Sequence, residues 1–164
     1  MNPPDGLEAV TSPASDLAVR EAVRDLIARY TWAGDRGRSA ELAALFSADG
    51  VLDVGAHGGR WEGAATIAAE LDAVAVRVAA AGDAPGPVRH HVSSTVIEVL
   101  GPDDATAASY FLVITTIGPD HWGRYRDRFA RIDGHWCFVE RMVRVDGHAA
   151  GSLMVRPDEA PDAT

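Results

Sequence analysis

AVRDLIARYTWAGDRG, residues 22–37, completes an amphipathic segment whose apolar side chains recur every three or four residues. Ser12 and Pro13 supply a good N-cap and a first-turn proline, so the pattern predicts a helix that begins there. Gly34 and Gly37 are expected to loosen its end. One face of this helix should turn toward a core, through Val19, Val23, Leu26, Tyr30 and Ala33.

Outward from this helix, short elements are followed by a meander of strands. A helix over 39–46, two short strands (GVLDVG and GGRWEG) around a glycine-rich turn with His57, and a helix over 64–81 precede the loop AGDAPGP. Turns at 101–104, at 118–120 and at the hairpin signal Asp133-Gly134 then separate four long strand candidates, residues 88–100, 105–117, 121–132 and 135–146. Helices followed by a meander predict an α+β fold, with a curved antiparallel sheet wrapped around a helix layer.

Length and charge restrict the class of protein. A chain of 164 residues and 17.3 kDa predicts one domain, over 12–148, with flexible ends at 1–11 and 149–164. The net charge of −9 and the pI near 5.0 argue against nucleic acid as a partner. No apolar run is long enough for a membrane span, and the first residues do not resemble a secretory signal, so a cytoplasmic protein is expected.

Two polar side chains at the end of the first helix, Tyr30 and Asp35, are candidates for chemistry together with a histidine of VRHHVSSTVIEV, residues 88–99. A histidine beside a carboxylate makes a base that works near neutral pH. Only one of His90 and His91 can face the interior, because side chains alternate along a strand. The alternation groups His90 with Val92, Ser94 and Val96, and His91 with Ser93, Thr95, Ile97 and Val99; a one-residue bulge would reverse the assignment.

Several ordered motifs resemble the SnoaL-like branch of the nuclear transport factor 2-like superfamily, which includes scytalone dehydratase, bile-acid 7α-dehydratase and hexachlorocyclohexane dehydrochlorinase. The resemblance covers roughly 15–146 and implies a cone-like antiparallel or mixed sheet around the N-terminal helices, with a cone-shaped pocket. The segments that carry it are AVRDLIARYTWAGDRG, AELAALFSADGVLDVG, WEG, RHHVSSTVIEV and GRYRDRFARIDGHWCF.

The resemblance also implies site residues. Asp35 falls on the helix-end aspartate of these lyases, His90 on their strand histidine, Tyr30 on a tyrosine of the bile-acid enzyme, and Arg141 near an arginine of the dehydrochlorinase. Two features depart from the family pattern. Ser94 replaces a common asparagine, and the strand that should carry a second histidine or aspartate offers only Ser109, Tyr110, Thr115 and Thr116.

These matches predict a cofactor-independent lyase of the dehydratase type. His90 would be the base, Asp35 would orient it, Tyr30 would act as acid or donor, and Arg141 would face developing negative charge. Each residue also has a simpler reading: His90 satisfied by a backbone partner, Asp35 as a helix terminator, Tyr30 as core, and Arg141 paired on the surface with Glu140 or Asp146.

The remaining candidates concern the ligand. Asp53 lies near the base position of ketosteroid isomerases in this superfamily, and a carboxylate in an apolar cavity could have a raised pKa and act alone. Apolar lining predicts a small hydrophobic cyclic substrate. No metal-ligand spacing or nucleotide motif is present, so neither a metal nor a cofactor is expected. The aromatic residues expected at the pocket are Trp32, Phe46, Trp61, Tyr110 and Tyr125.

Two further functions stay open. The same pocket suits an isomerase or a polyketide cyclase, and it also suits a ligand-binding or assembly module without catalysis. The long, partly apolar strands 105–117 and 121–132, with the family resemblance, predict a homo-oligomer, a dimer or trimer.

Overall fold

The computed structural model describes residues 13–56, 58–80 and 86–152. Several sequence predictions lie outside these ranges: the flexible N-terminus over 1–11, His57 in its turn, most of the loop AGDAPGP, and the tail from residue 153 onward.

Three helices precede the main strands: α1 (Pro13–Gly34), α2 (Ser39–Ala43) and α3 (Ala64–Ala80). The predicted boundaries of the first and third helices are close to these. The second helix is shorter than predicted, because the chain has already entered the first strand at Phe46. No helix in the described ranges has the length and apolar content to cross a bilayer. The buried side chains of α1 are Val19, Val23, Leu26, Ile27 and Ala33.

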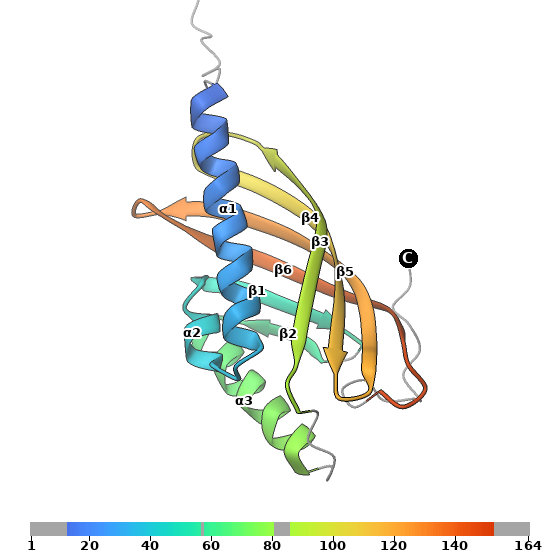
Figure 1. Cartoon of the computed structure of the whole chain (residues 1–164). Helices are drawn as coiled ribbons and strands as arrows, with labels where there is room; N and C mark the ends of the chain where they lie inside the picture. Colours follow the sequence, from blue (N-terminus) through green and yellow to red (C-terminus); the bar gives the residue numbers. More distant parts are fainter. Residues whose placement is uncertain (1–12, 57, 81–85, 153–164) are drawn as a thin grey trace, which may run out of the picture.

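Six strands form one mixed sheet in the order β2-β1-β6-β5-β4-β3. β1 pairs in parallel with β6, and all other neighbours are antiparallel. In Figure 1 the sheet curves, α1 lies across one of its faces beside β3, and α2 and α3 gather near β1 and β2. This is the predicted α+β architecture. The strands are β1 (Phe46–Gly55), β2 (Gly59–Glu62), β3 (Arg89–Val99), β4 (Asp104–Thr115), β5 (Gly118–Ile132) and β6 (His135–His148).

Two of the three hairpin turns in the meander differ in how well the sequence predicted their position. Asp133 and Gly134 have φ of 50° and 81°, as a two-residue turn between twisted strands requires, so that turn is confirmed. The preceding turn was predicted at 118–120 but lies at 116–117, since Gly118 already pairs with Thr115. Gly118 has a φ of 90°, which explains why a glycine stands at the start of β5.

The face of the sheet that packs against α1 is called the inner face below. Alternate residues of β4 and β5 are buried there, and those between them are more exposed. Aromatic rings fill its centre: Phe46 stacks on Phe138 with centroids 5.1 Å apart, and Phe111 stacks on Tyr125 at 4.6 Å. The inner face therefore forms the core, with polar side chains confined to a few positions.

A bulge in β3 changes which residues face inward. Strict alternation predicts that Ser94 and Val96 share the face of His90. The pairing with β4 instead shifts between Ser93 and Val96, Ser94 has a φ of 52°, and Val96 is 69% exposed. The predicted face assignment is therefore wrong beyond the bulge, where the more buried side chains are Thr95, Ile97 and Val99.

Candidate functional site

The end of α1 meets the start of β3 through Asp35 and His90. His90 Nδ1 lies 2.6 Å from Asp35 Oδ1, and the His90 backbone N–H donates to the same carboxylate at 3.1 and 3.3 Å. The side chains are 23% exposed for His90 and 8% exposed for Asp35. Fifty-five residues of chain separate the two groups, and only the packing of α1 beside β3 brings them together.

The carboxylate determines which histidine nitrogen is available. An ionised carboxylate only accepts hydrogen bonds, so Nδ1 of His90 carries the proton, and Nε2 of the neutral ring keeps its lone pair. Nε2 makes no hydrogen bond with any residue in the described ranges. His91 is exposed, as expected for a side chain on the opposite face. The structure thus answers the question that alternation left open: His90 is the histidine that faces inward.

A groove of about 390 Å³ opens beside this pair, between α1 and β3. Trp32 stands at its rim, 61% exposed, with the Arg36 guanidinium 3.2 Å from the ring centroid. The lining combines apolar side chains with a few polar ones, which is typical of a site for a small molecule. Its residues are Arg24, Ile27, Ala28, Thr31, Trp32, Asp35, His90, Val92 and Thr95.

Arg141 lies on the inner face and is fully buried. It forms a bidentate ion pair with Asp127, which is also fully buried. Its Nε and Nη2 donate to the two carboxylate oxygens at 2.8 and 2.7 Å. This contradicts the alternative of a surface pairing with Glu140 or Asp146. Those two acids instead pair with other arginines on the sheet, Glu140 with Arg60 and Arg128, and Asp146 with Arg124.

Sequence reasoning missed Asp127. In GRYRDRFARI it stands in a run of arginines, and its charge favours a solvent-facing position. The alternation of side chains along the strand could have revealed its burial, because Asp127 lies on the same face of β5 as the buried residues Tyr125 and Phe129. A buried charge needs a partner. The residue opposite Asp127 on β6 is Arg141, which supplies one.

Aromatic rings surround the Arg141 guanidinium. Its central carbon lies 4.1 Å from the ring centroid of Tyr30, 4.2 Å from that of Tyr125 and 4.5 Å from that of Phe138. Burial raises the pKa of both tyrosines above the ordinary value, although the Arg141 charge opposes the rise. Burial by itself would lower the pKa of Arg141, but the Asp127 carboxylate outweighs it and the pKa is raised. Both phenols therefore stay neutral, and the guanidinium stays charged.

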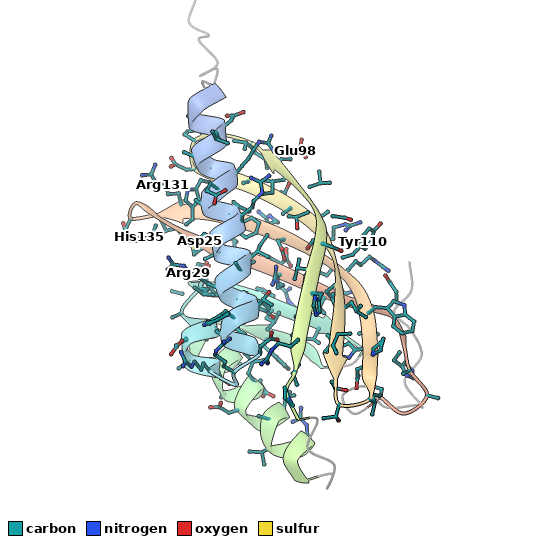
Figure 2. All side chains as sticks on the ribbon, in the orientation of Figure 1. Asp25, Arg29, Glu98, Tyr110, Arg131 and His135 are labelled. Carbon is teal, nitrogen blue, oxygen red and sulfur yellow. The ribbon has the colours of Figure 1, made fainter. Side chains whose placement is uncertain are left out.

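The other predicted ligand contacts are dispersed. Phe46 and Trp61 are buried in the core, and neither they nor Tyr30 and Tyr125 line the groove. Tyr110 is 57% exposed on the outer face, because it is out of phase with the buried residues of β4. Figure 2 labels it on the far side of β3 from α1. Of the five predicted aromatic contacts, Trp32 alone belongs to the groove lining.

Asp53 does not lie in an apolar cavity. Its carboxylate accepts from Arg144 at 2.8 and 3.2 Å and from the Gly55 backbone N–H at 2.9 Å. The Arg144 hydrogen bond is the main cause that holds the pKa of Asp53 below its usual value, against a smaller opposing effect of burial. The expectation of a lone base with a raised pKa is wrong for this residue, because an arginine neutralises it.

A second histidine–carboxylate pair, which sequence reasoning also missed, lies on β5. His121 Nδ1 is 2.8 Å from Oδ1 of the buried Asp120, which also accepts from Thr115 and from Ser152. The Ala149 N–H donates to the Asp120 carbonyl at 2.7 Å. Residues 149–152, predicted as the start of a flexible tail, are therefore hydrogen-bonded to the sheet.

Metal ligands do not gather in the part of the chain that the structure describes, where no group of three or more His, Cys, Asp or Glu side chains has a suitable arrangement. The polar groups that line the groove include the His90 imidazole, the Asp35 carboxylate, the Arg24 guanidinium and the hydroxyls of Thr31 and Thr95.

The SnoaL-like domain family matches residues 15–142, and the chain belongs to that family. No curated protein matches the chain. Solved structures with the same architecture include a nuclear transport factor 2-like protein with a cystatin-like fold from Novosphingobium aromaticivorans. It is 28% identical, with a TM-score of 0.69, over 90% of this chain and 96% of that one.

Two further solved structures have the same architecture at lower identity. A scytalone dehydratase-like protein from Novosphingobium aromaticivorans is 22% identical, with a TM-score of 0.69, over 92% of this chain and 100% of that one. LinA is 20% identical, with a TM-score of 0.71, over 90% of this chain and 100% of that one. At these identities the likeness concerns the fold alone. The name of that fold comes from the 28% identical protein, and it is the nuclear transport factor 2-like fold that the sequence predicted.

Proposed function

We propose that this protein is a cofactor-independent lyase that removes water from a small hydrophobic cyclic metabolite bound in the groove between α1 and β3. The contact between His90 Nδ1 and Asp35 Oδ1 at 2.6 Å carries the proposal, because it presents a lone pair on Nε2 in a partly sheltered, mostly apolar groove. Membership of the SnoaL-like family, and structural likeness to a scytalone dehydratase-like protein, support the same reaction class.

In the proposed reaction, His90 Nε2 takes a proton from the carbon next to the one that carries a hydroxyl. The electrons of that C–H bond form a C=C bond, and the C–O bond breaks. The leaving hydroxyl takes up a proton and departs as water, so His90 returns to its neutral form when it passes its proton on. Asp35 stabilises the imidazolium in between, and a base placed in this way typically contributes about 10²–10⁴-fold in rate.

Charge that develops on the substrate needs a stabilising group, and Arg141 is the candidate. Asp127 balances its charge, but the guanidinium stays protonated and lies against the ring of Tyr30. Tyr30 keeps its phenolic proton because burial raises its pKa. We therefore assign Tyr30 a role as neutral hydrogen-bond donor or acid in the proposal, although its ring also packs as part of the core.

Replacing His90 with Ala or Asp35 with Asn tests the proposal. With a panel of ring compounds that carry a hydroxyl β to an acidic C–H, wild-type protein should give a product lighter by one water. Both variants should lose at least about a hundredfold in turnover because they lack the base or its orienting charge. Mass spectrometry of the product is the measurement.

His91→Ala is the matched control, because it removes a neighbouring imidazole that points away from the groove, and it should keep full turnover. Wild-type turnover that survives in both His90→Ala and Asp35→Asn would contradict the proposal. A product of unchanged mass would instead identify an isomerase or cyclase, and binding without turnover would identify a ligand-binding module.

A further inference from the structure

One cation of the groove lining has no part in the proposed reaction. Arg24 on α1 lines the groove, and it is the one arginine or lysine among the described lining residues. Its side chain is 51% exposed, and its ion pair with Glu21 is a long one, 3.9 Å from Nη1 to Oε2. An exposed pair of this kind contributes little free energy. The Arg24 guanidinium can therefore exchange Glu21 for an acid group of a ligand at small cost.

Two contacts fix how α1 lies against β3. Near the start of the helix, Arg20 Nη1 donates to the carbonyl of Ile97, and at its end Asp35 contacts His90. The two elements therefore run in opposite directions. The fifteen residues of helix between these contacts rise roughly 22 Å, and the seven residues of strand span roughly the same length. Positions between the two contacts can therefore be matched in order.

The same comparison gives the position of Arg24 along the groove. Arg24 lies one helical turn after Arg20, about 6 Å along the axis, and about two residues of strand before Ile97 span the same length. The strand residue at that level is Thr95, which also lines the groove. Arg24 and Thr95 therefore mark one end of the groove, and the histidine–carboxylate pair marks the other.

The two ends are far enough apart for separate parts of one ligand. From Arg24 to Asp35 the helix rises about 16 Å, and the two positions lie within about 20° of each other around the axis. The lining between the ends includes the apolar side chains of Ile27, Ala28 and Val92. An apolar ring system suits this middle section.

Charge distinguishes the two ends. Arg24 brings a positive charge to one end, whereas the other end carries the Asp35 carboxylate. An acid group on a ligand is attracted to the first end and repelled by the second. A ligand with one such group would therefore bind in one orientation, with the acid at Arg24 and its far end at His90.

We propose that Arg24 binds a carboxylate of the ligand, so that the groove selects an elongated, ring-containing carboxylic acid. The fork of a guanidinium matches the two oxygens of a carboxylate, which makes this group the best fit among common acid groups of small metabolites. The inference deepens the proposed lyase function and, in its catalytic meaning, rests on it. Arg24 would determine specificity: it would hold the carboxylate at one end and place the reacting carbon at His90.

Two compounds of the same shape test the role of charge. Biphenyl-4-carboxylate and biphenyl-4-carboxamide match in size, and only the first is charged at neutral pH. Equilibrium dialysis at low salt should show that wild-type protein binds the carboxylate at least about fivefold more tightly than the amide, as one partly exposed ion pair provides. Arg24→Gln should reduce this preference to less than about twofold, by weakening the binding of the carboxylate alone.

Arg29→Gln is the matched control. Arg29 is an exposed arginine of the same helix, pairs with Asp25 at 2.7 Å and is not part of the groove lining. Figure 2 shows it on the side of α1 away from β3. This variant changes the net charge equally and should keep the full preference. Both arginine variants should unfold near the wild-type temperature, because each loses only an exposed ion pair.

His90→Ala tests the orientation of the ligand. It should keep the preference for the carboxylate, because that group is expected at the opposite end of the groove. A preference that disappears in His90→Ala and survives in Arg24→Gln would place the carboxylate beside the histidine and overturn the inference.

Three other results would overturn it: equal binding of the two compounds by wild-type protein, binding of neither, or a preference that Arg29→Gln reduces as much as Arg24→Gln. The lyase proposal fails separately, through the turnover of the His90 and Asp35 variants. A preference that depends on Arg24 in a protein without turnover would support the carboxylate site alone. Turnover without such a preference would leave the lyase and remove this inference.

Discussion

At the scale of single residues, three aspartates of this chain differ because of the basic group that each one meets. Asp35 contacts an imidazole at the mouth of a groove, Asp127 a buried guanidinium, and Asp53 an arginine on a partly exposed part of the sheet. The first pair leaves a lone pair on the histidine, whereas the other two are ion pairs with arginine, one fully buried and one partly exposed. The same side-chain type thus belongs to a candidate base, a buried ion pair of the core and an ordinary ion pair.

Asp53 gives a pH-dependent prediction. Its folded-state pKa is lowered by Arg144, so the stabilisation is present above the unfolded pKa, about 3.9, and is lost as the pH falls through the lower folded value. Asp53→Asn should therefore lower the melting temperature at neutral pH. The difference from wild type should shrink steadily below about pH 4. Thermal melts from neutral to strongly acidic pH measure it, and a difference that grows on acidification would contradict the assignment.

At the scale of elements, the bulge in β3 determines the composition of the groove. It allows His90 and Val92 on one side of the bulge, and Thr95 on the other, to line the same groove. Without the extra residue, Thr95 would point outward and Val96 inward. The bulge depends on Ser94, whose φ of 52° is unusual for a residue other than glycine.

Ser94→Gly should therefore be neutral or should stabilise the fold by up to about 1 kcal/mol, because glycine adopts positive φ without strain. Ser93→Gly is the matched control: Ser93 has no such φ and lies in the same strand. It should destabilise by roughly 0.5–1 kcal/mol, through added freedom in the unfolded chain. Chemical denaturation of the two variants measures the contrast. Equal destabilisation by both would show that the bulge does not depend on the φ of Ser94.

At the scale of the whole molecule, the sheet has one face covered by α1 and one face without a covering element among the described residues (Figure 1). Tyr110 and Val96 are large exposed apolar side chains on the uncovered face, 57% and 69% exposed. Tyr110 lies on β4, one of the two strands whose apolar content led to the prediction of a homo-oligomer, and Val96 lies on the neighbouring β3. The homo-oligomer remains a proposal.

Sedimentation analysis should accordingly give a mass of two or three times 17.3 kDa. Tyr110→Glu should shift the protein toward the single-chain mass, because a charge would be buried in the contact. Leu17→Glu on α1, where the leucine is 64% exposed and away from that face, should not change the mass. A wild-type protein that sediments as a single chain at high concentration would contradict the proposal.

The order of helices and strands, the Asp133-Gly134 turn and the amphipathic face of α1 were all predictable from sequence, since they depend on local spacing and local backbone preference. The resemblance to a family was also readable, and it selected Asp35, His90, Tyr30 and Arg141. The burial of Asp127 could be derived only from the alternation of side chains along β5. Its pairing with Arg141 could be derived only from the register between β5 and β6.

Sequence alone therefore determined the fold class and the residue types available for chemistry, because hydrophobic periodicity and turn residues act over a few neighbours. Only the tertiary structure decided which of them meet. The bulge at Ser94, the contact of Asp35 with His90 across 55 residues of chain, and the burial of Arg141 all arise from strand register and helix packing, which are long-range properties.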